Sequence, residues 1–206
     1  KIKYDFIDIG ANIGIMSKCL LNNKIKLSNT YCVEPNQENY FCLKNNLKDY
    51  KNIKFFNFAL STKKEDKKLF IDKNNMGNLS FYYEMVERDK LGFMNSPDNY
   101  EIIECESTQK FFKSIKLKKN IIKIDTQGYD EIIFQEIPKS VLKKNQILII
   151  EITPINEKKI NFSKYRENLN LYKKFTDFDG NIYSKDQVME LSKKTKGKNI
   201  DLIFLK

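Results

Sequence analysis

Residues 4–14 read YDFIDIGANIG, and the rest of the chain is organised around them. Residues 4–9 are rich in β-branched and aromatic side chains, which predicts a buried strand. Gly10 and Gly14 allow a sharp turn and let a ligand approach the main chain closely. Residues 15–21 suit a helix whose free N–H groups point back at this turn. A strand, a glycine turn and a helix in this order are typical of an α/β protein that holds a nucleotide-type ligand at the carboxyl edge of a parallel sheet.

The composition indicates a folded protein. A length of 206 residues is enough for one α/β core and too short for two comfortable ones, so we expect a single domain over residues 1–206. The apolar content of 41% and the aromatic content of 13% exclude a disordered chain. No run approaches the roughly 18 apolar residues of a membrane span, and no signal peptide is visible. Because the chain starts without Met and almost directly on a strand, we expect a natural segment before Lys1.

Cysteine usage predicts neither a metal centre nor disulfides. The chain has no histidine, and its four cysteines (Cys19, Cys32, Cys42 and Cys105) form no CxxC pair. A zinc site would need distant thiolates and carboxylates, so we expect no metal. Cys32 falls in a predicted strand and Cys19 and Cys42 in predicted helices of an enzyme-like fold. We therefore expect free thiols and a cytoplasmic protein.

The net charge of +10 raises the possibility of nucleic-acid binding. Only Arg88 and Arg166 are arginine, however, and the lysines are spread over the whole chain in small clusters. Heavy use of Lys, Asn and Ile also suggests an AT-rich coding bias. We favour a solvated lysine-rich surface over a phosphate-binding stripe, so nucleic acid is not the expected partner.

Three predicted strands end on acidic residues. Glu34 follows the strand at residues 30–33 and lies twenty positions after Gly14 (34 − 14), where dinucleotide folds place the acid that accepts both ribose hydroxyls. Asp125 follows residues 120–124, and Glu151 follows residues 146–150. Unpaired buried charge is unfavourable in a purely structural sheet, so carboxylates at successive strand tips indicate a ligand site. The alternative for Glu34 is that it merely favours the start of the next helix.

Other segments give weaker signals. Residues 53–58 predict a third strand, and residues 100–105 predict another. Residues 72–99 lack a clear period, so we interpret them as an insertion beside the ligand edge that carries acceptor specificity, with a plain surface loop as the alternative. Asp179-Gly180 between apolar runs predicts a hairpin, and with a last strand at residues 199–205 it favours antiparallel strands at one sheet edge.

Three motifs together resemble the FkbM family of S-adenosylmethionine-dependent methyltransferases. They are DIGANIG at residues 8–14, Glu34-Pro35-Asn36, and KIDTQGYD at residues 123–130. The likeness covers nearly the whole chain; the first motif suits many methyltransferases, whereas the third is more particular. Two positions depart from the family pattern. Asp130 stands where Glu is more frequent, and residues 108–110 read Thr-Gln-Lys where Thr-Leu-Asp is usual, so no role for an acid there is carried over.

The resemblance implies a Rossmann-like class I methyltransferase fold. This is a seven-stranded, mostly parallel sheet with helices on both faces and an antiparallel C-terminal strand. The implied cofactor is S-adenosylmethionine, and the implied reaction is methylation of a hydroxyl on a sugar or small metabolite. The expected cofactor-binding residues are Asp8, Gly10, Ala11, Asn12 and Gly14 at the glycine turn, Glu34 and Pro35 at the ribose, Asn57 and Ala59 near the adenine, and Asp125 facing the methyl donor.

Methylation of a hydroxyl benefits from a general base, because the hydroxyl is weakly acidic. The sulfonium of the cofactor supplies the reactive methyl group, so the protein must align the acceptor and remove its proton. Without histidine, Asp125 is the preferred base. Lys123 on the same strand face is a possible partner, or has a structural role. Glu151 is a third candidate, either lining the acceptor pocket or capping the following loop. Alternatively, Asp125 anchors the cofactor or a loop without proton transfer.

Three other functions stay open at this point. A nicotinamide-dependent oxidoreductase shares the strand, turn, helix and acid, although its turn reads Gly-x-Gly-x-x-Gly rather than Gly-x-x-x-Gly. An RNA ribose methyltransferase would exploit the positive charge. A non-catalytic protein would bind the cofactor without transferring its methyl group to an acceptor. The oligomeric state is not predicted.

Overall fold

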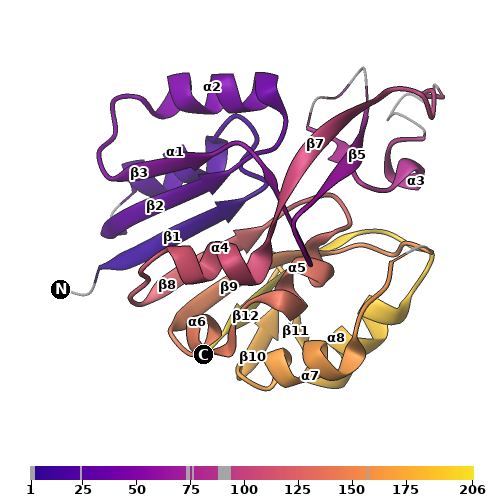
Figure 1. The fold of residues 1–206 in the computed structure, drawn as a ribbon. Helices are drawn as coiled ribbons and strands as arrows, with labels where there is room; N and C mark the ends of the chain where they lie inside the picture. Colours follow the sequence, from indigo (N-terminus) through magenta and orange to yellow (C-terminus); the bar gives the residue numbers. More distant parts are fainter. Residues whose placement is uncertain (1–2, 24, 73–74, 76, 88–93, 157) are drawn as a thin grey trace.

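The computed structural model describes residues 3–23, 25–72, 75, 77–87, 94–156 and 158–206, and this part of the chain forms two sheets (Figure 1). The larger sheet contains β1 (Tyr4–Ile9), β2 (Leu27–Val33), β3 (Ile53–Phe56), β8 (Asn120–Ile124), β9 (Asn145–Ile152), β10 (Lys174–Thr176), β11 (Ile182–Tyr183) and β12 (Ile200–Leu205). The smaller sheet contains β4 (Ala59–Ser61), β5 (Glu65–Ile71), β6 (Leu79–Ser80) and β7 (Tyr100–Ser107). The helices are α1 (Ile15–Asn22), α2 (Gln37–Leu47), α3 (Tyr83–Val86), α4 (Thr108–Ser114), α5 (Asp130–Glu136), α6 (Lys139–Leu142), α7 (Phe162–Leu169) and α8 (Lys185–Lys193).

The first strand lies inside the larger sheet, whose order is β11-β10-β12-β9-β8-β1-β2-β3. β1 pairs in parallel with β2 on one side and with β8 on the other. β3 and β9 extend this parallel region. Because parallel strands share one carboxyl edge, the turns after β1, β2 and β8 meet at the same edge.

The other end of the larger sheet is antiparallel. β12 runs antiparallel to β9, and β10 and β11 follow it as an antiparallel hairpin. The predicted hairpin is confirmed at Asp179-Gly180. The predicted seven strands with one reversed strand are wrong, since the described residues give eight strands, three of them in this antiparallel part. β10 and β11 are too short to stand out in the sequence, and their turn is closed by the Asp177 carboxylate, which accepts from the backbone and side-chain nitrogens of Asn181 at 2.9 and 2.8 Å.

The smaller sheet was not predicted. β5 runs antiparallel to both β6 and β7, and β4 runs parallel to β7. The strand predicted at residues 100–105 exists but belongs here rather than to the larger sheet. Of the predicted insertion at residues 72–99, the described part supplies β6 and α3, whereas residues 73, 74, 76 and 88–93 lie outside the described residues. Figure 1 shows this sheet beside the ends towards which the β1 and β2 arrows point.

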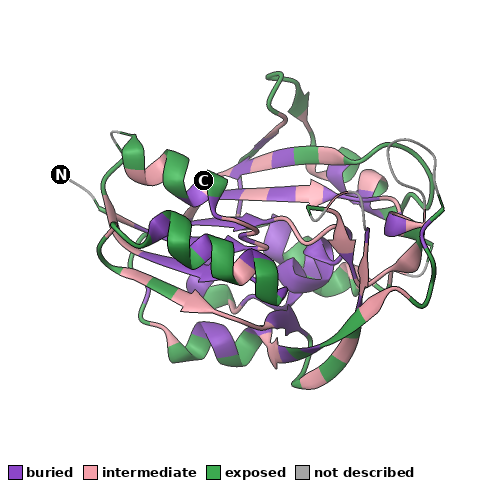
Figure 2. Cartoon of the chain, turned by 90° about the horizontal axis from the view of Figure 1, so that it is seen from above, coloured by how far each residue is buried: buried purple, intermediate pink, exposed green. Residues whose placement is uncertain are grey.

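Helices pack on both faces of the larger sheet, as predicted. Alternate side chains of a strand point to opposite faces, so Tyr31 and Val33 join the main core with α4, α5 and α7. Cys32 between them packs on the other face against Leu43 and Leu47 of α2. Figure 2 shows buried strands between helices whose outer faces are exposed. None of the described helices is both long and apolar enough to cross a membrane.

Candidate functional site

A cleft opens where the carboxyl edge of the larger sheet faces the smaller sheet, and residues of both sheets line it. Six of the predicted site residues line the cleft: Gly10, Asn12, Glu34, Pro35, Ala59 and Asp125. The structure therefore brings the ends of β1, β2 and β8 together in one site.

The turns after β1 and β8 touch at Gly10. Its φ is +73°, and a Cβ at this position would lie 1.8 Å from the carbonyl oxygen of Asp125. The Asp125 backbone N–H donates to the Ile9 carbonyl at 3.0 Å, which fixes the two turns side by side. Only glycine fits here, because the facing atom is backbone and cannot move aside.

Gly14 and Ala11 support the turn from behind rather than line the cleft. Gly14 has a φ of +86° at the N-cap of α1, and a Cβ there would lie 2.7 Å from Leu43 Cδ1. Ala11 is buried in the cluster that Leu43 and Leu47 also join. Gly14 and Ala11 were predicted to bind the cofactor, but in this structure they let α2 pack closely against the turn and do not line the cleft.

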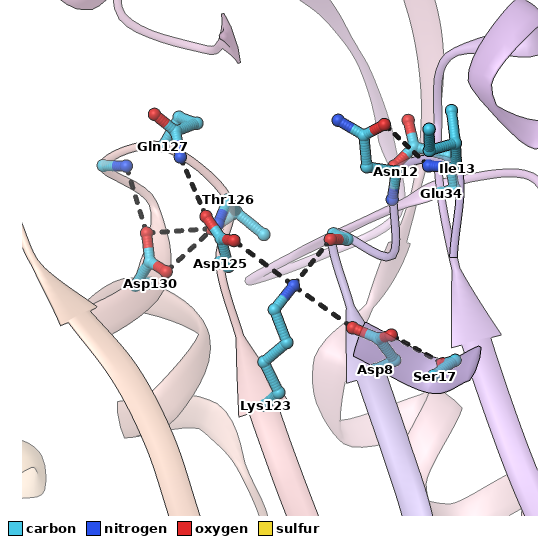
Figure 3. A network of polar contacts seen from close by, with 12 residues as sticks. Asp8, Asn12, Ile13, Ser17, Glu34, Lys123, Asp125, Thr126, Gln127 and Asp130 are labelled. Atoms are coloured by element: carbon cyan, nitrogen blue, oxygen red, sulfur yellow. Dashed lines mark hydrogen bonds and ion pairs between the residues drawn. The ribbon is translucent and has the colours of Figure 1, made fainter. Parts of the chain in front are cut away.

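Glu34 ties the glycine turn to the end of β2 (Figure 3). Its Oε2 accepts from the Asn12 backbone N–H at 2.8 Å, and its Oε1 accepts from the Asn36 N–H at 3.0 Å. Burial raises the pKa of Glu34 to about 7, although both N–H bonds favour the ionised form. Each carboxylate oxygen has a second lone pair, so the group can still accept two hydroxyls.

Asn57 lies behind the turn that follows β2. Its Nδ2 donates to the carbonyl oxygens of Glu34 and Pro35, both at 3.0 Å. The side chain thereby orients two residues that line the cleft, and it is not among the lining residues itself. Ala59, two positions further on, does line the cleft.

Lys123 is a buried cation between the two turns (Figure 3). Its Nζ lies 3.2 Å from Asp8 Oδ1 and 3.3 Å from Asp125 Oδ2, and it donates to the Gly10 carbonyl at 2.9 Å. Burial alone would lower the pKa of Lys123, but the charges of Asp8 and Asp125 outweigh it and raise the pKa. Lys123 therefore stays protonated and cannot be the proton acceptor. Asp8 is fully buried and accepts from Ser17 Oγ at 2.6 Å, so it holds Lys123 rather than contacts a ligand.

Asp125 is the candidate base that faces the cleft. Its side chain is 42% exposed, in contrast to the buried Asp8. Oδ1 accepts from Gln127 Nε2 at 2.8 Å, and Oδ2 faces Lys123. Each oxygen keeps a lone pair for a further hydrogen bond.

Glu151 lies at the same edge but not in the cleft. Its two oxygens accept from Asn199 Nδ2 and Thr153 Oγ1, each at 3.0 Å. β9 is one strand further from β1 than β8, and Glu151 is paired in register with Asp201 of β12. Among the residues that the structure describes, Glu151 is therefore not part of the cleft lining, and its predicted role in the acceptor pocket lacks support.

Asp130 was not predicted as a site residue, although it lies in the third motif. Its Oδ1 accepts from the Thr126 N–H at 3.0 Å, and its Oδ2 accepts from the Gly128 N–H at 3.0 Å and from Thr126 Oγ1 at 3.2 Å. The first residue of α5 thereby clamps the turn that carries Asp125.

For the second wall of the cleft, the sequence predicted only an insertion at residues 72–99 beside the ligand edge and named none of its residues as site residues. This wall consists of Leu69, Gly77, Leu79 and Phe81, from the smaller sheet and the residues beside it. Contacts between distant segments hold this wall in place. Ser80 Oγ donates to the Gln127 carbonyl at 2.6 Å, and Lys67 Nζ donates to Tyr129 Oη at 3.0 Å. No local sequence pattern reports contacts between segments so far apart in the chain.

Comparison with known proteins gives a family and a fold. The sequence model of the methyltransferase FkbM domain matches residues 8–183. The curated proteins gave no match. The solved structure of methyltransferase FkbM from Methylobacillus flagellatus KT is 15% identical with a TM-score of 0.57, and the alignment covers 98% of this chain and 43% of that one. This chain thus spans less than half the length of that protein.

Two further solved structures align over nearly the whole chain. M. capricolum TrmK in complex with S-adenosyl-homocysteine is 14% identical with a TM-score of 0.46, covering 99% of this chain and 62% of that one. Precorrin-6y C5,15-methyltransferase from Geobacter metallireducens GS-15 is 11% identical with a TM-score of 0.43, covering 99% and 80%. The FkbM structure shows the class I methyltransferase fold here, and the family match spans the glycine turn, Glu34 and Asp125. The chain belongs to the FkbM methyltransferase family.

Proposed function

We propose that this chain transfers the methyl group of S-adenosylmethionine to a hydroxyl of a sugar or small metabolite. The observation that carries the proposal is the meeting of Gly10, Asn12, Glu34 and Asp125 in one cleft. Family membership supports methyl transfer. The cofactor and the hydroxyl acceptor are our inference from the side chains that line the site.

The cleft residues suit S-adenosylmethionine. Gly10 lacks the Cβ that would fill the space beside Asp125, so the methionine part can approach the main chain. Glu34 has the free lone pairs to accept both ribose hydroxyls, and the apolar side chains of Ala59 and Leu60 offer a surface for the adenine. When bound, the cofactor supplies a methyl group on a positively charged sulfur, which is an electrophile.

Asp125 is the proposed general base. With the methyl donor bound, Asp125 would take the proton of the acceptor hydroxyl as that oxygen is methylated, and S-adenosylhomocysteine would be the other product. Lys123 contributes a fixed positive charge that holds the Asp125 carboxylate without competing for the proton. The arrangement thus meets the two needs of the reaction, an aligned acceptor and a proton acceptor.

The charge of the cleft favours a neutral acceptor. Its described lining includes two carboxylates, Glu34 and Asp125, and neither lysine nor arginine. A nucleic-acid substrate would place phosphates near the site and would require cations there. We therefore propose a sugar or metabolite hydroxyl, with Gly77, Leu79 and Phe81 of residues 72–99 forming a wall that contacts both the cofactor and the acceptor.

The test is a labelled transfer experiment. S-adenosylmethionine with an isotopic methyl group is incubated with the protein and a pooled extract of glycans and metabolites, and labelled products are identified by mass spectrometry. We expect label on a hydroxyl oxygen. Calorimetric titrations with S-adenosylmethionine and with a nicotinamide cofactor run in parallel, and binding of the nicotinamide cofactor alone would refute the proposal.

A further inference from the structure

Gln127 adopts a backbone conformation that its side chain makes unfavourable. Its φ is +51°, in the left-handed region where a Cβ crowds the following carbonyl. Among the described residues, the other non-glycine residues with positive φ are Asn12 and Asn52. Asparagine tolerates this region, because its short polar side chain bonds locally, whereas glutamine has no such advantage.

The turn around Gln127 does not need a glutamine. Ser80 Oγ donates to the Gln127 carbonyl at 2.6 Å. Asp130 accepts from the Thr126 and Gly128 N–H groups, both at 3.0 Å. These bonds use backbone atoms of the turn, so a glycine at position 127 would make the same carbonyl bond without the crowding. Strain that the surroundings hold in place is characteristic of functional sites.

The side chain of Gln127 acts on Asp125. Gln127 Nε2 donates to Asp125 Oδ1 at 2.8 Å, while Lys123 Nζ lies 3.3 Å from Oδ2 on the opposite side (Figure 3). Held at both oxygens, the carboxylate cannot rotate freely about its last torsion. Gln127 and Asp125 both line the cleft, so this constraint fixes which lone pairs face an acceptor.

We propose that Gln127 is a positioning residue of the transfer reaction, retained in a strained conformation because its amide holds the Asp125 carboxylate towards the acceptor. This inference rests on the proposed function. It predicts that a glycine at position 127 suits the turn conformation better, whereas the native glutamine gives the higher turnover.

The experiment compares Gln127→Gly and Gln127→Ala with Asn52→Gly and Asn52→Ala. Position 52 is the matched control, because Asn52 is also left-handed, with a φ of +62°, but is exposed and is not among the described cleft-lining residues. Thermal unfolding, S-adenosylhomocysteine affinity by calorimetry, and labelled methyl transfer to the pooled extract are measured for each. At both positions we expect the glycine variant to unfold at a higher temperature than the alanine variant.

The turnover of the Gln127 variants should not follow the order of their unfolding temperatures. Both Gln127 variants lack the amide, so both should lose at least about tenfold in kcat, with S-adenosylhomocysteine affinity within about threefold of wild type. Both Asn52 variants should keep wild-type kcat. A Gln127→Gly protein with wild-type kcat overturns the inference, as does one less stable than Gln127→Ala. Failure of the proposed function looks different: the wild-type protein itself would transfer no methyl group to the extract. Failure of the Gln127 inference alone leaves an active wild-type protein and a Gln127 variant with unchanged turnover.

Discussion

Glu34 has a buried carboxylate whose pKa is raised from 4.5 to about 7, mainly by burial. A raised pKa means that the free protein disfavours the ionised form, so this group stabilises the fold below pH 4.5 and loses that contribution as the pH rises through 7. Binding of two ribose hydroxyls needs the ionised form, because only that form leaves both oxygens as acceptors. Cofactor affinity should therefore increase where Glu34 ionises.

We predict that S-adenosylhomocysteine binds about tenfold more tightly at pH 8 than at pH 6, following the ionised fraction of Glu34. Calorimetric titrations at pH 6, 7 and 8 measure this. Glu34→Gln should bind more weakly at pH 8 and show little of the pH dependence. A wild-type affinity that does not change between pH 6 and pH 8 would contradict the ribose assignment.

Asp125→Asn tests the proton acceptor. The amide keeps the size of the side chain but cannot take a proton, so methyl transfer should fall by about 10²–10⁴-fold, while S-adenosylhomocysteine affinity stays within about tenfold. The control is Asp179→Asn, which makes the same chemical change at an exposed position of the β10–β11 turn. Normal transfer by Asp125→Asn would leave Asp125 as an anchor only.

Individual site residues were predictable where they end a strand. Gly10, Glu34 and Asp125 directly follow apolar strands, so local pattern and spacing place them at one sheet edge. Glu151 carries the same local signal, but strand order, which local pattern does not encode, sets it beside β12 and outside the described cleft lining. Gln127 escaped prediction since neither its backbone dihedral angle nor its hydrogen bond to Asp125 is visible in the sequence pattern.

Among the secondary-structure elements, the two glycines of the first turn have different tasks. Ala at position 10 would place its Cβ against the Asp125 carbonyl, whereas Ala at position 14 would meet a methyl group of Leu43 that can rotate. Both positions are left-handed, which alone disfavours alanine by about 1–2 kcal/mol. We predict a loss of about 1–3 kcal/mol in unfolding free energy for Gly14→Ala and more than about 4 kcal/mol for Gly10→Ala.

Urea denaturation measures this difference, and S-adenosylhomocysteine titration accompanies it. Gly14→Ala should keep most of its affinity, because Gly14 does not line the cleft. Equal losses of stability in the two variants would mean that the β1 and β8 turns move apart easily, contrary to the contact at Gly10.

Elements with a long apolar run were predictable, and short ones were not. β8 is an almost continuous aliphatic strand buried on both faces, and its type is evident from composition. β10 and β11 have three and two residues, and pairing in the sheet defines them rather than propensity. The same limit explains the wrong strand count.

In the whole molecule, the cleft belongs to two sheets at once. Gly77, Leu79 and Phe81 face the glycine turn across it. We predict that S-adenosylhomocysteine at about 100 times its Kd slows amide exchange in β6 and in the turns after β1 and β8 by up to about 100-fold. The β10–β11 hairpin, which is distant in the sheet order, should exchange as before.

Hydrogen–deuterium exchange with mass spectrometry makes this comparison. Protection confined to the turns of the larger sheet would assign the smaller sheet to the acceptor alone. The docking of the smaller sheet was not predictable, because β5 and β7 carry alternating patterns that fit the edge of either sheet. Contacts such as that between Phe81 and Tyr129, whose ring centroids lie 5.0 Å apart, decide the choice and join segments far apart in the chain.

The position of β1 between β2 and β8 also governs how the chain is made. β1 and β8 pair in register from Asp5 and Asn120, which are 115 residues apart (120 − 5). At a synthesis rate of about 5–20 residues per second, several seconds pass between the emergence of β2 and that of β8, the second strand that pairs with β1. During that interval an apolar strand has one open edge outside the ribosome. The nascent chain should therefore depend on chaperones until residue 124 has emerged, and late truncations should aggregate less than those that end before β8.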